Sequence, residues 1–167
     1  MDTTSDSTIF TGCWRCDRID GDWDAFLCVA GLGWMSRQIA KTLGYGIGMR
    51  QIITMDGATV MKVTIKMAGP IPGNTQTILL DGSAQELPLA DGSPATGTCM
   101  WRDDGSLVAI AVKRGGEAQG SEFTLTRSIV SGRMRLVLCV SGVTVSREFK
   151  REDAVLQSGP ASGTPED

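Results

Sequence analysis

Alternating apolar and polar residues over the last third of the chain predict three strands, at residues 123–130, 133–140 and 143–150. Side chains alternate between the two faces of a strand, so each of these strands has one apolar face. A Ser-Gly pair at 131–132 and another at 141–142 are typical of two-residue hairpin turns. The segment therefore predicts an antiparallel meander whose apolar face is directed inward.

Two arginines interrupt that apolar face. Arg127 lies on the first of these strands and Arg147 on the third. The hairpin register places Leu136 between them, with the two arginine backbones roughly 10 Å apart. Glu122 and Glu148 fall on the outer faces, so these strands offer no internal carboxylate. Because a buried guanidinium without a partner is very costly, we expect something anionic to meet both arginines.

The anion could belong to the protein or to a ligand. An internal ion pair is weak evidence of function. We favour a ligand headgroup, because two long arginine side chains at one level can hold a carboxylate through charge-assisted, bidentate bonds. The side chains expected to line a cavity beside this headgroup, each of which could equally be ordinary core, are Leu125, Met134, Leu136, Leu138, Val145 and Phe149.

Residues 22–43 change to helical spacing and predict a helix–turn–helix. The apolar stripe of the first helix follows the i, i+3, i+4, i+7 pattern, with Trp23, Phe26, Leu27 and Ala30. A second helix is predicted at 34–43, with Met35, Ile39 and Leu43 as its apolar stripe and Arg37, Gln38 and Lys41 facing away. We expect Trp14, Trp23 and Trp34 to pack the floor and the lid of the fold.

Short apolar segments make up most of the remaining chain. Further strands are predicted at residues 9–16, 50–54, 59–66, 76–80, 98–102 and 107–113. Many short strands separated by turns predict a sandwich or a barrel. An early helix pair followed only by meandering strands favours an antiparallel barrel with a helical lid, which can be wide enough to hold one ligand.

Composition narrows the functional classes. The chain has 167 residues, a net charge of −3, five cysteines and no histidine. These features argue against general nucleic-acid binding, a zinc site and histidine-dependent catalysis, and the odd cysteine number suggests free thiols. No run of about 18 apolar residues is present. We expect a cytoplasmic, monomeric, non-enzymatic protein without cofactor or metal, with a flexible leader at 1–8, one domain at 9–154 and a disordered tail at 155–167.

The chain resembles the intracellular lipid-binding proteins, which include the fatty-acid-binding and cellular retinoid-binding proteins. Its opening Phe10-Thr11-Gly12-Cys13-Trp14 is similar to the Phe-x-Gly-x-Trp start of that family. Residues 23–40 (WDAFLCVAGLGWMSRQIA) are similar to its helix–turn–helix, and residues 124–150 to its last three strands. The resemblance is weak over 68–97, where this chain is longer.

The resemblance implies an all-β fold, a ten-stranded antiparallel up-and-down barrel of the calycin (lipocalin-like) type with a helix–turn–helix lid at 22–43. It also implies that Arg127 and Arg147 hold a ligand carboxylate. The family's second arginine belongs to an Arg-x-Tyr motif, whereas this chain has Arg147-Glu148-Phe149, so one hydroxyl donor is missing.

We therefore expect a carrier of a long-chain fatty acid or a similar hydrophobic carboxylate. The alternatives are a carrier of a retinoid (retinoic acid), a barrel enzyme, and an interaction module that uses the same fold. The family's lid is also thought to touch membranes transiently. With only Arg37 and Lys41 as charges on the second helix, a solvated helix face is the better interpretation here.

Overall fold

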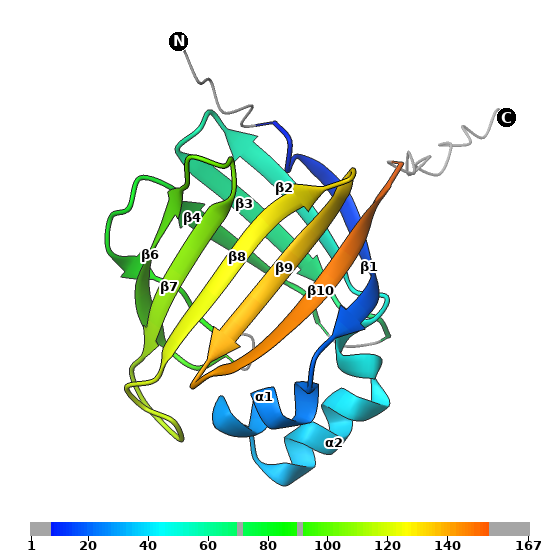
Figure 1. Ribbon diagram of the computed structural model, residues 1–167, viewed down its shortest axis with the longest axis vertical. Coiled ribbons are helices and arrows are strands. Elements are labelled where there is room, and N and C mark those ends of the chain that lie inside the picture. The colour runs from blue at the N-terminus through cyan, green and yellow to red at the C-terminus, as the bar shows by residue number, and fades with distance from the viewer. Residues whose placement is uncertain (1–7, 70–71, 90–91, 154–167) are drawn as a thin grey trace, which may run out of the picture.

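The computed structural model describes residues 8–69, 72–89 and 92–153, and within them ten strands form one antiparallel sheet (Figure 1). Their order is β4-β3-β2-β1-β10-β9-β8-β7-β6-β5. The strands are β1 Gly12–Asp20, β2 Arg50–Asp56, β3 Val60–Lys66, β4 Asn74–Leu79, β5 Gln85–Glu86, β6 Ala95–Trp101, β7 Leu107–Lys113, β8 Glu122–Val130, β9 Arg133–Val140 and β10 Val143–Glu152. The predicted ten-stranded barrel is confirmed.

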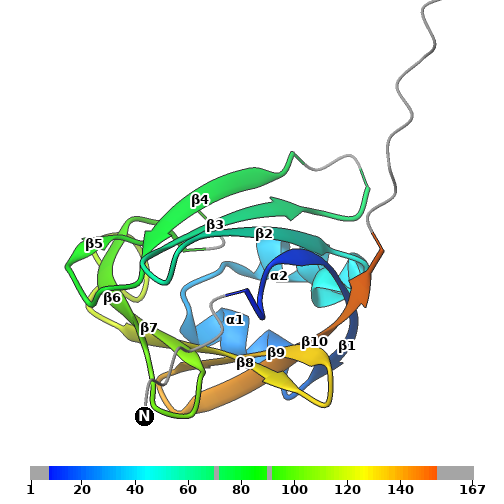
Figure 2. The ribbon, with the colours of Figure 1, turned by 90° about the horizontal axis from the view of Figure 1, so that it is seen from above.

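The sheet wraps around so that two layers face each other. Figure 2 shows β2, β3 and β4 on one side and β7 to β10 on the other, with β1 at the edge where the two layers meet. At the opposite edge β4 and β6 approach each other, and an isolated bridge pairs Asp81 with Met100. Two helices, α1 Trp23–Val29 and α2 Trp34–Thr42, lie at one end of the barrel (Figure 1).

Strand register in the C-terminal meander agrees with the sequence prediction. Val130 pairs with Arg133 and Val140 with Val143, as expected for two-residue turns. Leu136 pairs with Arg127 on one side and with Arg147 on the other. The two arginines therefore lie at one level of the barrel wall and point to its interior.

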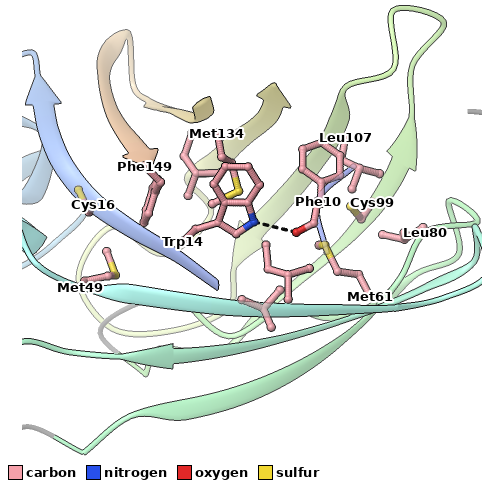
Figure 3. Packing of buried hydrophobic residues seen from close by; sticks show 13 residues of the cluster. Phe10, Trp14, Cys16, Met49, Met61, Leu80, Cys99, Leu107, Met134 and Phe149 are labelled. Atoms are coloured by element: carbon pink, nitrogen blue, oxygen red, sulfur yellow. Dashed lines mark hydrogen bonds between the residues drawn. The ribbon is translucent and has the colours of Figure 1, made fainter. Parts of the chain in front are cut away.

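The core fills the end of the barrel near the start of β1. Trp14 and Phe10 are fully buried there, and the Trp14 indole Nε1 donates to the Phe10 carbonyl at 2.8 Å, as Figure 3 shows. Phe149, Met134 and Leu107 pack into the same cluster. This bond satisfies the one polar atom of the Trp14 side chain, so the large ring can be buried without an unpaired donor.

The first helix behaves as its pattern predicts. Trp23, Phe26 and Ala30 are buried, and Asp22 caps the helix by accepting a hydrogen bond from the Ala25 amide at 2.9 Å. The first strand differs from the prediction of 9–16, because it begins at Gly12 and continues to Asp20 through an irregularity between Cys16 and Arg18.

The second helix corrects two predictions. Its apolar side chains are exposed, at 66% for Trp34, 70% for Met35 and 56% for Ile39, so Trp34 does not pack the lid. Arg37 does not face away either, because its Nη1 donates to the Leu32 carbonyl at 2.8 Å and its Nε pairs with Asp24 at 3.2 Å. The guanidinium holds the α1–α2 turn together, and this turns the apolar stripe outward.

The predicted flexible leader, apart from residue 8, and the predicted tail at 155–167 lie outside the described residues. No helix in the described ranges is both long and apolar enough to span a membrane. The five cysteines are all free thiols, as expected.

Candidate functional site

A cavity of about 390 Å³ occupies the barrel interior beside the core cluster. Its wall is mostly apolar and comes from strands β2, β3, β4, β6, β7, β8, β9 and β10, together with segments that follow β3 and β5. Arg127 and Arg147 are the only charged side chains among the described residues that line it. Ligand pockets generally measure about 300–1,000 Å³ and combine an apolar wall with a few polar groups, and this cavity has both properties.

Among the described residues, the hydrogen-bond partners of Arg127 are all neutral. Its side chain is 4% exposed, and its Nη1 donates to the Gln51 Oε1 at 2.8 Å and contacts the Met134 Sδ at 3.1 Å. Its Nε is buried with no hydrogen-bond partner in the described part of the chain. Burial lowers the pKa of Arg127 to about 10, and the group stays protonated at neutral pH.

Two donors of Arg127, Nε and Nη2, have no hydrogen bond to the described residues. These atoms form one edge of the guanidinium, and a carboxylate can accept from both at once. Gln51 takes the remaining nitrogen, Nη1, and thereby fixes the orientation of the group. Arg127 is thus a cation of fixed orientation in the wall of an apolar cavity, and it has no anionic partner in the described part of the chain.

Arg147 lines the cavity and also contacts the helical lid. Its Nε and Nη2 donate to the Tyr45 carbonyl at 3.0 and 2.7 Å. Its guanidinium carbon lies 4.1 Å from the centre of the Trp23 ring, a cation–π contact with α1. Burial lowers the pKa of Arg147 to about 10. Its Nη1 has no hydrogen bond to the described residues, so this nitrogen is the one available to a ligand.

Two residues with positive φ bring the backbone at Tyr45 close to the Arg147 guanidinium. Tyr45 and Gly46 both have positive φ, 52° and 99°, in the short helical turn Gly44–Gly46. A Cβ at Gly46 would lie 3.0 Å from the Arg147 Nε, so a side chain here would crowd the guanidinium. Glycine therefore lets the chain after α2 approach the arginine closely.

Gln51 is the site residue that sequence reasoning missed. It lies on β2 opposite Trp14, is 4% exposed and lines the cavity beside Arg127. A neutral amide between the apolar Met49 and Ile53 carries little signal by itself. The alternation of β2 directs Gln51 inward, and a polar residue on an otherwise apolar inner face is the signal that identifies it.

The structure divides the six predicted lining residues into two groups. Leu125 and Leu136 line the cavity. Met134 and Phe149 are fully buried in the core cluster, and Val145 packs under α1, with Leu138 at the border of both clusters. These four do not line the cavity.

One cysteine shares the site. Cys99 lines the cavity and is 3% exposed, and burial raises the pKa of its thiol to about 11 even though Arg127 opposes the shift. The thiol is therefore neutral at pH 7 and does not act as a counterion for the arginine. No cluster of His, Cys, Asp or Glu suited to a metal ion occurs among the described residues.

Comparison with known proteins identifies the fold. No protein-family model and no curated protein sequence matches the chain. Among solved structures, a Schistosoma mansoni fatty acid binding protein in complex with arachidonic acid is 20% identical, with a TM-score of 0.73, over 88% of this chain and 98% of that one. The REP1-NXSQ fatty acid transporter is also 20% identical, with a TM-score of 0.69, over 86% of this chain and 96% of that one. The chain has the fold of the fatty acid binding proteins.

Proposed function

We propose that this protein is a non-enzymatic carrier, related to the intracellular lipid-binding proteins, that binds a long-chain fatty acid or a similar apolar carboxylate inside the barrel. The observation that carries the proposal is the Nε–Nη2 edge of Arg127, which is buried at the wall of an apolar cavity without any anionic partner among the described residues. The structural neighbours named above include a complex with arachidonic acid, which supports this ligand class.

The two arginines have different roles in this proposal. Arg127 receives the carboxylate on its open edge, while Gln51 holds the other side of the guanidinium. Arg147 contributes Nη1 and keeps its other edge on the Tyr45 carbonyl. The headgroup is thus bound next to the contacts that fasten the lid to the barrel.

Affinity comes mainly from the hydrocarbon chain. Burying each methylene contributes about 0.8 kcal/mol, and the apolar wall of the cavity provides the surface for it. Phe149 stands in the core cluster and adds no hydroxyl to the headgroup site. A carboxylate is therefore selected by two guanidinium groups, with Gln51 as their neutral support.

The test compares two ligands that differ only at the headgroup. We expect isothermal titration calorimetry to show tight binding of oleate and at least roughly tenfold weaker binding of oleyl alcohol, because a hydrogen bond to a charged group contributes about 1.5–3 kcal/mol. Retinoic acid and retinol form a second matched pair that distinguishes a retinoid carrier. The proposal is wrong if no member of either pair binds, or if each alcohol binds as tightly as its acid.

A further inference from the structure

Five cationic side chains lie side by side on the outer wall of the barrel. Arg50 of β2 pairs with Lys66 of β3 on one side and with Arg15 of β1 on the other. Arg15 in turn pairs with Lys150 of β10. The last paired residues of β9 and β10 at this end are Met134 and Phe149, and Arg133 and Lys150 are the next residues along the two strands. We call these five residues the basic row.

The row crosses five adjacent strands at one level, over roughly 19 Å at the usual strand spacing. Like charges directly opposite each other on neighbouring strands destabilise a sheet. Arg15 has a cation opposite it on both sides, so the arrangement lowers the stability of the sheet. Its Nε is also buried without a hydrogen-bond partner in the described part of the chain.

Carboxylates neutralise only part of this charge. Glu152 pairs with Arg50 at 2.7 Å, and Arg133 pairs with Asp17 and, at 3.4 Å, with Glu148. The remaining members, Lys66, Arg15 and Lys150, form no ion pair with the described residues, although, after the hydrogen bond from Arg50, the charges of Arg15 and Lys150 also help to lower the pKa of Glu152. Arg18 and Arg135 lie in the next row, where both are paired in register with Glu148. Within the described ranges, the seven cations of these two rows have three carboxylates as ion-pair partners or neighbours in register, on a protein whose net charge is −3.

The shape of the wall favours one kind of partner. Figure 2 shows that β1 stands at the edge where the two layers of the barrel meet. Arg15 of β1 is the middle residue of the five, so the row passes from one layer to the other. A flat membrane surface can touch only part of such a row, whereas an extended chain can follow it. The exposed apolar side chains Trp34, Met35 and Ile39, which would suit a lipid surface, lie on α2 and outside the row.

We propose that the basic row is a docking surface for an acidic polypeptide segment of a partner protein. Alternate carboxylates of that segment replace the solvent that now faces Lys66, Arg15 and Lys150 and relieve the like-charge contacts across the strands. The surface is separate from the cavity, and the proposal does not depend on the identity of the ligand carried inside the barrel.

The test uses a fluorescein-labelled peptide of ten glutamates and measures anisotropy with the full chain. The row variant, Arg15→Gln with Lys150→Gln, is compared with a control of equal charge, Lys62→Gln with Arg102→Gln, whose residues are exposed and outside the row. We expect binding that weakens with salt, and a roughly fivefold loss of affinity in the row variant relative to the control, as for two exposed charge contacts. Oleate binding should be unchanged in both variants.

Equal affinity of the two variants for the peptide would overturn the proposal. So would a result in which phosphatidylserine vesicles, but not the peptide, distinguish the two variants, because the partner would then be a lipid surface. If the row variant does not fold, backbone amide shifts of the wild-type protein during the peptide titration decide the question. They should move at β1, β10 and β2, and shifts confined to other strands would contradict the proposal.

Discussion

Replacing Arg127 by methionine should stabilise the ligand-free protein and weaken ligand binding. The arginine is 4% exposed, and its partners among the described residues are the neutral Gln51 and Met134. Methionine has a similar length, carries no charge and suits the apolar wall. If Arg127 served mainly to stabilise the fold, its replacement should lower stability. The substitution therefore distinguishes a structural role from a ligand-binding role.

The magnitude follows from the cost of burying the charge. Burial lowers the pKa of Arg127 well below the ordinary value of an arginine, to about 10. Each pKa unit corresponds to about 1.4 kcal/mol, so keeping the cation buried at pH 7 costs roughly 3 kcal/mol. The lost hydrogen bond to Gln51 offsets about 1.5–3 kcal/mol of this. We expect a net gain near 1 kcal/mol and a rise in Tm of about 2–4 °C.

Urea denaturation and oleate calorimetry measure the two effects on one protein preparation. Oleate affinity should fall roughly 10- to 100-fold, because the bidentate edge is lost. Arg102→Met removes an exposed arginine outside the cavity and should leave both quantities unchanged. A loss of more than about 1 kcal/mol of stability, together with unchanged oleate affinity, would show that Arg127 is a structural residue and not a ligand-binding one.

Three further substitutions or labelling experiments test other parts of the site. Gly46→Ala should lower the free energy of unfolding by about 1–3 kcal/mol more than Gly57→Ala, because both glycines have positive φ but only a Cβ at Gly46 would crowd a guanidinium; equal losses in urea denaturation would contradict this. Gln51→Leu should destabilise the protein by about 1–3 kcal/mol, since it removes the acceptor of a buried charged donor, and an unchanged denaturation midpoint would show that the contact is dispensable. At pH 8 the Cys99 thiol, whose pKa is raised to about 11 by burial, should be alkylated by iodoacetamide far more slowly than the exposed Cys28. Comparable rates in site-resolved mass spectrometry would contradict the burial of Cys99.

The strand register and the arginine pair were predictable because local signals agree there. Ser-Gly turns at 131–132 and 141–142 fix the hairpin loops, and a one-residue slip would expose every apolar side chain of the meander. Arg127 and Arg147 stood out because a charge on such a face contradicts its surroundings. Counting residues back from the two turns then places both arginines opposite Leu136, at one level of the barrel wall.

The missed features depend on contacts between distant segments. Gln51 faces Arg127 because β2 and β8 lie on opposite layers of the barrel, 76 residues apart in sequence. The orientation of α2 is set by Arg37, whose bonds to the Leu32 carbonyl and Asp24 cannot be read from the spacing of apolar residues. In the same way, the partner of Arg147 is a backbone carbonyl, which no residue pattern specifies.

The basic row could not be predicted from the sequence of any single strand. Each of its members alternates correctly with an inward residue, so every strand by itself predicts an ordinary solvated outer face. The like-charge neighbours become visible only when β1 is placed between β2 and β10. That placement brings the first and last strands of the barrel together. Because these strands are far apart in sequence, the sequence alone does not show that they are neighbours.

The most direct measurement is the titration of a bound carboxyl group. Oleate labelled with carbon-13 at the carboxyl can be followed by NMR in the complex as the pH is lowered. Two guanidinium groups in an apolar cavity should keep the carboxylate ionised well below the pKa of an ordinary carboxyl, so its resonance should stay constant until the protein unfolds. A carboxyl resonance that titrates at an ordinary pKa while the protein remains folded would place the headgroup in solvent and contradict the role of Arg127 and Arg147.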